Sequence, residues 1–169
     1  MTIEIELTQG KIALIDDEDW DLVSGYRWHA CTTPRHNTWY AQAHTRRADG
    51  TWTKIKMHRL ILGLTDPRVH TDHIDGDGLN NRRGNLRACS NSENQRNRGS
   101  QANNTSGFKG VSWDKETGKW AANIRVNGKQ KRLGRHDTPE EAYQAYCDAS
   151  IELHGEFANT GTISQEIIT

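Results

Sequence analysis

Hydrophobic and polar residues alternate in short runs along the first sixty positions. The runs IEIEL at 3–7, KIALI at 11–15 and WYAQAH at 39–44 carry β-branched or aromatic residues with the period of a half-buried strand. Turns are indicated between them, at Gly10 and at Asp49-Gly50. In the run KIKMHRLILGL the alternation ends at Met57 and an apolar cluster follows, which is typical of a strand leading into a short helix. The pattern predicts a small β-rich N-terminal region.

A second alternating region lies after residue 107. The runs KGVSWD, KWAANIRV and KQKRLGRH predict three strands, with Asn127-Gly128 as a strong signal for a two-residue hairpin turn. The stretch Thr138-Pro139-Glu140-Glu141 offers an N-cap, a first-turn proline and a capping-box glutamate for a helix. One face of that helix is apolar, at Ala142, Ala145, Tyr146, Ala149 and Leu153. Three antiparallel strands packed on one amphipathic helix are therefore predicted.

Between these regions, Ser90 and Glu93 have the spacing of a capping box and predict a short helix. The following stretch is poor in apolar residues and rich in Gly, Ser and Asn, as flexible linkers are. We predict an α+β chain with a first domain at 1–98, a linker at 99–107, a second domain at 108–160 and a tail at 161–169.

Charge is segregated along the chain, although 22 Lys or Arg balance 22 Asp or Glu overall. Residues 1–26 carry one Lys against seven acidic residues, and residues 136–169 carry seven acidic residues and no base. Residues 82–135 carry thirteen bases against three acidic residues. One interpretation is that the acidic and basic segments pair with each other in the fold. A concentrated basic block more often marks a nucleic-acid footprint.

The hydrophobic fraction of 33% indicates a small core that a metal or a partner would help to stabilise. Cys31, Cys89 and Cys147 lie far apart and form no C-x-x-C pair, so we do not expect a structural zinc. We expect the three cysteines to be reduced thiols. The N-terminus has no apolar run of the length that a signal peptide or membrane span needs. We expect a cytoplasmic protein without membrane association.

The chemistry-bearing residues gather in TDHIDGDGLNNRRGNLRACSNSENQRN, residues 71–97. Hydrolysis of a phosphodiester needs a base for water and a cation for the phosphate charge. His73 can accept a proton near neutral pH, and Asp72 is an oxygen ligand of the kind that Mg²⁺ prefers. Strand alternation would point them to opposite sides, so both can serve one phosphate only where the strand ends, and the turn from Asp75 provides that ending.

This stretch resembles the HNH endonucleases, specifically the phage and intron-encoded homing type with a ββα-metal site. The likeness rests on DHIDGDGLNNRRGNLR and SENQRN, with TQGKIALIDDEDW and MHRLILG upstream. It implies His73 as general base, Asn85 as the residue that orients it, and Asp72 and Asn94 as metal ligands. Asn97 is the competing second ligand. Asn in place of a final His favours a single Mg²⁺, with Mn²⁺ as a substitute.

A calcium-binding loop is another interpretation of the motif. Asp75-Gly76-Asp77 imitates the start of an EF-hand, but its sixth and twelfth positions would be Asn80 and Leu86, so a calcium loop fails. Asp75, Asp77, Asn80 and Asn81 are predicted to form the loop, and His58 and His70 to pack or contact DNA. Arginines around the motif can neutralise phosphates: Arg82, Arg83, Arg87, Arg96 and Arg98.

The second domain resembles the plant ethylene-response-factor (APETALA2 type) DNA-binding domain, in the words KGVSW, KWAANIR and RLG. That family lays a three-stranded sheet in the major groove, backed by one helix. The resemblance places Lys109, Asn123, Arg125, Gln130, Arg132 and Arg135 at the DNA. It also turns Trp120, Ala122, Ile124 and Leu133 toward the helix. Ser112, Asp114 and Arg132 depart from the plant pattern, so its base preference is not transferred.

Together these features predict a site-directed homing endonuclease for double-stranded DNA, acting in a phage-infected bacterial host. A monomer is favoured and should nick one strand. Two alternatives stay open: a DNA-binding regulator with a silent nuclease site, and a nuclease for RNA or structured DNA.

Overall fold

The computed structural model describes residues 1–32, 38–97 and 104–161. The chain forms two compact units, Met1–Asn91 and Ser92–Thr169. Most of the predicted linker, Arg98 and most of the predicted tail lie outside the described residues. Each unit combines strands with short helices, so the predicted α+β class is confirmed.

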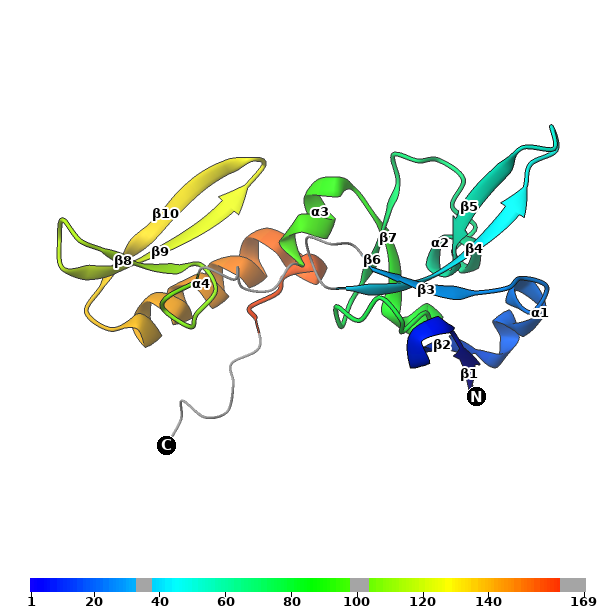
Figure 1. Ribbon diagram of the computed structural model, residues 1–169. Helices are drawn as coiled ribbons and strands as arrows, with labels where there is room; N and C mark the ends of the chain where they lie inside the picture. Colours follow the sequence, from blue (N-terminus) through cyan, green and yellow to red (C-terminus); the bar gives the residue numbers. More distant parts are fainter. Residues whose placement is uncertain (33–37, 98–103, 162–169) are drawn as a thin grey trace. The chain divides into compact units, whose positions relative to one another are not determined.

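The first unit is built from three small antiparallel sheets, with strand orders β1-β2, β3-β4-β5 and β6-β7 (Figure 1). Its strands are β1 (Thr2–Glu6), β2 (Ile12–Asp16), β3 (His29–Thr32), β4 (Trp39–Arg46), β5 (Trp52–Lys56), β6 (His70–His73) and β7 (Leu86–Cys89). Its helices are α1 (Trp20–Val23) and α2 (Met57–Ile61), with 3-10 turns η1 (Thr8–Gly10), η2 (Asp17–Asp19) and η3 (Arg83–Asn85). Helix α3 (Asn91–Arg96) follows Ser90, as its capping residues predicted, and from Ser92 on it belongs to the second unit.

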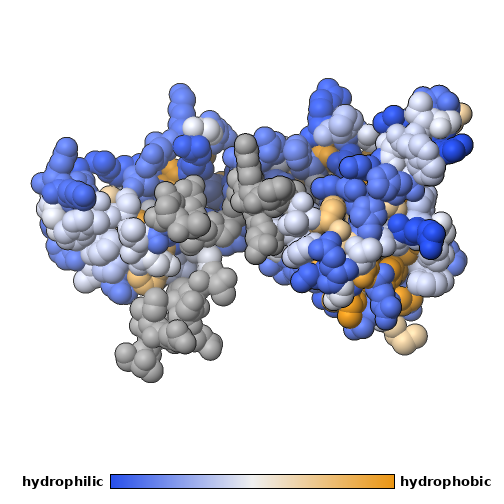
Figure 2. Space-filling view, viewed as in Figure 1, coloured by the Kyte–Doolittle hydropathy of each residue, from blue (hydrophilic) through white to orange (hydrophobic). Residues whose placement is uncertain are grey.

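The core of the first unit is small and made largely of short side chains. Strand β2 buries Ala13 and Ile15 on one side, and the β3-β4-β5 sheet contributes Ala30 and Ala41. Met57, at the point where the predicted strand becomes a helix, is fully buried among them. The alternation in the sequence therefore predicted the strands that cover this core. In the view of Figure 2, hydrophobic residues also reach the surface near the N-terminal strands.

The long loop between β6 and β7 is fastened to β2. The amide of Leu14 donates to the carbonyl of Leu79 at 2.9 Å, and the amide of Asn81 donates to the carbonyl of Leu14 at 2.7 Å. These bonds make an isolated parallel bridge between Leu14 and Asn80. The acidic N-terminal strands thus hold the loop that carries the central motif.

The second unit is a three-stranded sheet of order β10-β9-β8, packed on one helix. Its elements are β8 (Val111–Asp114), β9 (Lys119–Val126), β10 (Lys129–His136), α4 (Pro139–His154) and η4 (Gly155–Phe157). The β9-β10 turn has positive φ at both Asn127 and Gly128, which is the mirror-type hairpin turn that the Asn-Gly pair predicted. The Thr138 side chain accepts a hydrogen bond from the amide of Glu141 and caps α4.

Small residues let α4 lie close to the sheet. Ala122 and Ala142 are fully buried at the contact, and Ile124 packs on Tyr146 and Ala149. Trp120 and Leu133 border the same clusters. The predicted helix-facing side of the sheet is therefore confirmed. Among the described residues, no helix is both long and apolar enough to cross a membrane.

Candidate functional site

The central motif occupies the β6-β7 hairpin of the first unit. In the antiparallel register, Asp72 lies opposite Arg87 and His73 lies opposite Leu86. Strand β6 ends at His73, and Gly76 with φ of 80° turns the chain directly afterwards. The strand end that the sequence analysis required is therefore present. Asp72 and His73 are only 4% and 6% exposed, so both polar side chains need partners within the fold.

Asp72 forms an ion pair with Arg87. The Nε and Nη2 atoms of Arg87 donate to Oδ2 of Asp72 at 2.8 and 2.6 Å, and the two side chains are 13% and 5% exposed. A buried carboxylate stays ionised at little cost only when a charge or hydrogen bonds compensate it. Arg87, predicted to contact phosphate, thus has its guanidinium held on the predicted metal ligand.

Asn85 fixes the turn that follows the histidine. Its Nδ2 donates to Oδ1 of Asp75 at 2.9 Å and to the carbonyl of Asn80 at 2.8 Å, while its Oδ1 accepts from the amide of Asp75 at 3.0 Å. Burial raises the pKa of Asp75, but hydrogen bonds from Asn80, the Asp77 amide and Asn85 outweigh it and lower that pKa. Asn85 therefore fixes the loop that directly follows His73.

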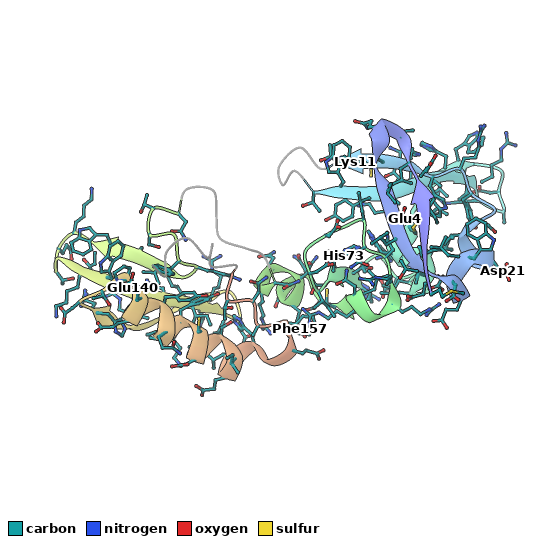
Figure 3. All side chains as sticks on the ribbon, turned by 90° about the horizontal axis from the view of Figure 1, so that it is seen from below. Glu4, Lys11, Asp21, His73, Glu140 and Phe157 are labelled. Atoms are coloured by element: carbon teal, nitrogen blue, oxygen red, sulfur yellow. The ribbon has the colours of Figure 1, made fainter. Side chains whose placement is uncertain are left out.

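The His73 side chain, labelled in Figure 3, is almost completely buried in the first unit. Burial lowers the pKa of His73 below its ordinary value, and Asn81 together with the carboxylates of Asp75, Asp72 and Asp77 partly opposes that effect. The outcome is an imidazole that stays neutral at pH 7 and can accept a proton. Asn81, predicted to be part of the loop, is the asparagine whose side chain raises the pKa of His73 against the effect of burial.

Two aromatic rings, those of His58 and Tyr40, line the site, although the sequence did not indicate either of them as part of it. The rings of His58 and His73 lie 5.1 Å apart, edge to face, and the ring of Tyr40 lies 5.6 Å from His58 and 5.9 Å from His73. His58 is 6% exposed, and burial followed by the nearby charges of His73, Lys56 and Arg59 lowers its pKa well below the ordinary value. Tyr40 comes from β4, so no local signal in the motif pointed to it.

The residues available for a metal are oxygen donors. Asp72 offers a carboxylate of which Arg87 holds one oxygen, Oδ2, and Asn94 in α3 offers an amide oxygen. A carboxylate with an amide suits a hard divalent cation that keeps waters in its shell. Asn97, the competing ligand, accepts a hydrogen bond at its Oδ1 from Asn159 at 3.0 Å, which favours Asn94. Asn94 belongs to the second unit and Asp72 to the first, so their pairing stays a prediction.

The predicted phosphate-binding arginines have different surroundings. Arg83 donates to Asp19 at 2.6 Å and pairs with Glu18, and its amide donates to Asp16. Within the described residues, Asp16, Glu18 and Asp19 are three acidic side chains whose oxygens lie close enough together to hold a metal ion, and Arg83 contacts all three. Arg82 donates through Nε to Asn80. Arg83 is thereby held to η2, while Arg82 stays beside the motif.

In the second unit, the face of the sheet turned away from α4 is basic. Arg125 and Gln130 are register partners, as are Asn123 and Arg132, and both arginines are exposed. Arg135, on the same face, pairs with Asp114 at 2.8 Å.

Lys109 has a different environment from the other predicted DNA contacts. Its Nζ donates to the carbonyls of Arg96 and Asn159, and burial lowers its pKa to about 8. This ammonium is engaged within the second unit. Strand β8 begins two residues later, at Val111, so Lys109 precedes the sheet.

Comparison with known proteins agrees with both resemblances. Residues 57–96 match the model of the HNH endonuclease family, and residues 106–156 match that of the AP2 domain. Protein 3.8 of Escherichia phage T7 is 40% identical over 104 residues, 62% of this chain and 85% of that protein. An uncharacterized HNH endonuclease of Acanthamoeba polyphaga mimivirus is 28% identical over 155 residues, 89% of this chain and 74% of the relative. No solved structure matches the chain.

Proposed function

Since the chain belongs to the same family as Protein 3.8 of Escherichia phage T7, and since an AP2 domain follows an HNH endonuclease domain in it, we propose that it is a homing-type endonuclease directed to sites in double-stranded DNA. The observation that carries the proposal is the buried pair Asp72 and His73 at the end of β6. A carboxylate and a neutral imidazole, adjacent in a fixed turn, are the groups that metal-assisted hydrolysis needs.

In the proposed reaction, His73 accepts a proton from the water that attacks the phosphorus. The lowered pKa of its imidazole supports this role, because a base must be unprotonated at the working pH. Asn85 holds the turn after His73 in place through Asp75, and Arg87 orients the Asp72 carboxylate. These contacts restrict both reacting groups to one geometry before substrate arrives.

Asp72 and Asn94 would hold one divalent ion, Mg²⁺ with Mn²⁺ as a substitute. When bound, such an ion stabilises the charge that develops on the phosphate and on the departing oxygen. Its oxygen donors fit a hard cation, as described above.

We propose that the AP2 domain recognises the DNA site at which the nuclease cuts. Arg125, Arg132, Asn123 and Gln130 present donors on one face of a sheet that a major groove can admit. A tethered reader raises the local concentration of a weak nuclease at its own site, which confines cutting to that site. We further propose that the protein acts as a monomer, nicks one strand per encounter and works on DNA in a phage-infected bacterial cytoplasm.

The proposal is tested by plasmid cleavage. Supercoiled DNA carrying genomic fragments from the source is incubated with Mg²⁺, Mn²⁺ or EDTA, and His73→Ala is compared with the parent protein. The variant should lose at least about 100-fold in rate, the usual minimum for a missing general base. Arg68→Ala, whose exposed side chain pairs with Asp66 outside the motif, is the control and should keep cutting. Equal metal-dependent cleavage by His73→Ala and the parent would refute the mechanism.

One observation favours a second candidate, a DNA-binding regulator with a silent nuclease site: Arg87 places a positive charge on the carboxylate that should hold a cation. Specific binding of duplex DNA without cleavage in any metal would support that candidate. Preference for RNA or branched DNA in a competition assay would instead indicate a nuclease for structured substrates.

A further inference from the structure

One face of the β3-β4-β5 sheet does not pack in the core and carries no residue of the 71–97 motif. Its other face is closed by Ala30, Ala41 and Ala43 in the core. Because side chains alternate along strands and register partners share a face, the opposite side of the sheet carries a different set. This set, which we call the β4 face, consists of His29, Cys31, Tyr40, Gln42, His44, Arg46, Trp52, Lys54 and Lys56.

The β4 face contains bases and no carboxylate. Residues 27–65 include seven Lys or Arg and a single acidic residue, Asp49. The carboxylate of Asp49 accepts from the amide and hydroxyl of Thr51, so it serves its own turn. Within the described residues, the ion pairs do not include Arg46, Lys54 or Lys56. In the view of Figure 2 the β4-β5 hairpin is coloured mostly hydrophilic.

Aromatic rings, and not acids, support two of these cations. The guanidinium of Arg46 lies 4.9 Å from the ring centre of Trp52, and Nζ of Lys56 lies 4.5 Å from that of Tyr40. Trp52 is 63% exposed. A cation over a ring keeps its charge available, because the ring does not neutralise it. Basic side chains interleaved with exposed rings are typical of nucleic-acid surfaces.

The β4 face is continuous with the nuclease centre. Tyr40, at its inner end, contacts the rings of His58 and His73, and from there β4 runs outward to Arg46. Six residues of strand span about 20 Å, at a rise of roughly 3.3 Å per residue. That length matches about six phosphates along one strand of B-DNA, at about 3.4 Å each.

We propose that the β4 face binds the phosphate backbone of duplex DNA beside the bond that is cut at His73. This inference rests on the proposed function and adds a DNA-binding surface in the first unit to the sheet of the AP2 domain. DNA is the occupant that the position of the face favours, because the Tyr40 ring lies beside the His73 ring and carries the Lys56 ammonium over it, so the face begins at the nuclease centre. The cations then follow about 6.6 Å apart, at every second residue, which is close to the spacing of every second phosphate.

The test measures how DNA affinity depends on salt, in full-length protein with His73→Ala to prevent cleavage. A 40-base-pair duplex of random sequence is the probe. The plot of log affinity against log salt should lose about 0.9 in slope for each phosphate contact removed. Arg46→Ala, Lys54→Ala and Lys56→Ala should each lose that amount, and the triple variant two to three times as much. Arg68→Ala is the matched control, because its side chain is 88% exposed and paired with Asp66; its slope should stay at the parental value.

Further measurements distinguish a loss of DNA binding from a loss of folding or of cleavage. Thermal unfolding checks that each variant is folded. Trp52→Ala removes no charge, so it should weaken DNA affinity without changing the slope of log affinity against log salt. In protein with His73 intact, the triple variant should still nick plasmid at low salt and fail sooner as salt rises. If the triple variant keeps the slope of Arg68→Ala, the inference is overturned, whatever the cleavage assay shows. If cleavage is absent but the slope falls, the proposed function fails and the surface stands.

Discussion

The hairpins β6-β7 and β9-β10 use arginine in opposite ways. In β6-β7, Arg87 is 13% exposed and holds Asp72 across the strand pair. In β9-β10, Arg125 and Arg132 are exposed, and their strand-pair partners are the uncharged Gln130 and Asn123. The same side chain is therefore a part of the fold in one hairpin and a surface donor in the other.

The difference follows from what lies against each hairpin. The β6-β7 hairpin is covered by the loop that β2 holds and by the rings of Tyr40 and His58, so charge there must be compensated inside the protein. The β9-β10 sheet buries mainly its α4 side, where alanines and aliphatic residues pack. Burial thus separates residues that set geometry from residues that can meet DNA.

The largest expected effect comes from Arg87→Ala. Removing one partner of a buried ion pair leaves the Asp72 charge uncompensated, and the free energy of unfolding should fall by about 3 kcal/mol. Urea denaturation measures this change. Arg125→Ala serves as the control in the other hairpin and should change stability by less than about 0.5 kcal/mol.

A double substitution separates charge from packing. Asp72→Asn with Arg87→Met removes both charges while keeping similar volume, and it should recover most of the lost stability. If Arg87→Ala is as stable as the parent, Arg87 does not behave as a structural residue and the contrast between the hairpins is broken.

The next effect depends on pH and involves His58. Burial holds its pKa in the folded protein well below 6.5, so the unfolded chain takes up a proton that the folded chain does not. This stability is fully present above pH 6.5 and is lost as pH falls, by at most about 1.4 kcal/mol per pH unit for this histidine. His58→Phe should flatten the decline between pH 6.5 and 5 in urea titrations, whereas identical declines would contradict the assignment.

The smallest effects on stability belong to the β9-β10 sheet, where affinity should change instead. Arg125→Ala and Arg132→Ala should each lower the salt slope of duplex binding by about 0.9, with an unchanged fold. Arg135→Ala is the sharper comparison, because Asp114 already holds that guanidinium. It should change the slope less than either neighbour; equal losses at all three positions would show that the ion pair opens on DNA.

Local signals predicted the second unit well. Asn127-Gly128 and Thr138 act on their immediate neighbours, so the sequence placed the turn and the helix start where the structure has them. The end of a strand at Asp72 and His73 was predicted as well, because the turn from Asp75 had to follow it. These features depend on residues a few positions apart.

Contacts between distant segments were not predictable in the same way. Arg83 was predicted to meet phosphate, but it reaches Asp19, 64 positions away, through the packing of η2 against the motif. Tyr40 joins the site only because β4 lies beside α2 and β6. The ion pair of Arg87 required the register of β6-β7, which one-residue slips would alter.

The backbone of Gly78 lies against β4 so closely that a Cβ atom there would collide with the Trp39 carbonyl and the Tyr40 ring. The loop and strand are thus fitted to each other across nearly forty positions of sequence. Leu14 adds a further junction from β2. The HNH match begins at residue 57, yet these contacts come from before it. A protein engineer who moves the nuclease centre onto another reader should therefore transplant residues 1–96 as one cassette.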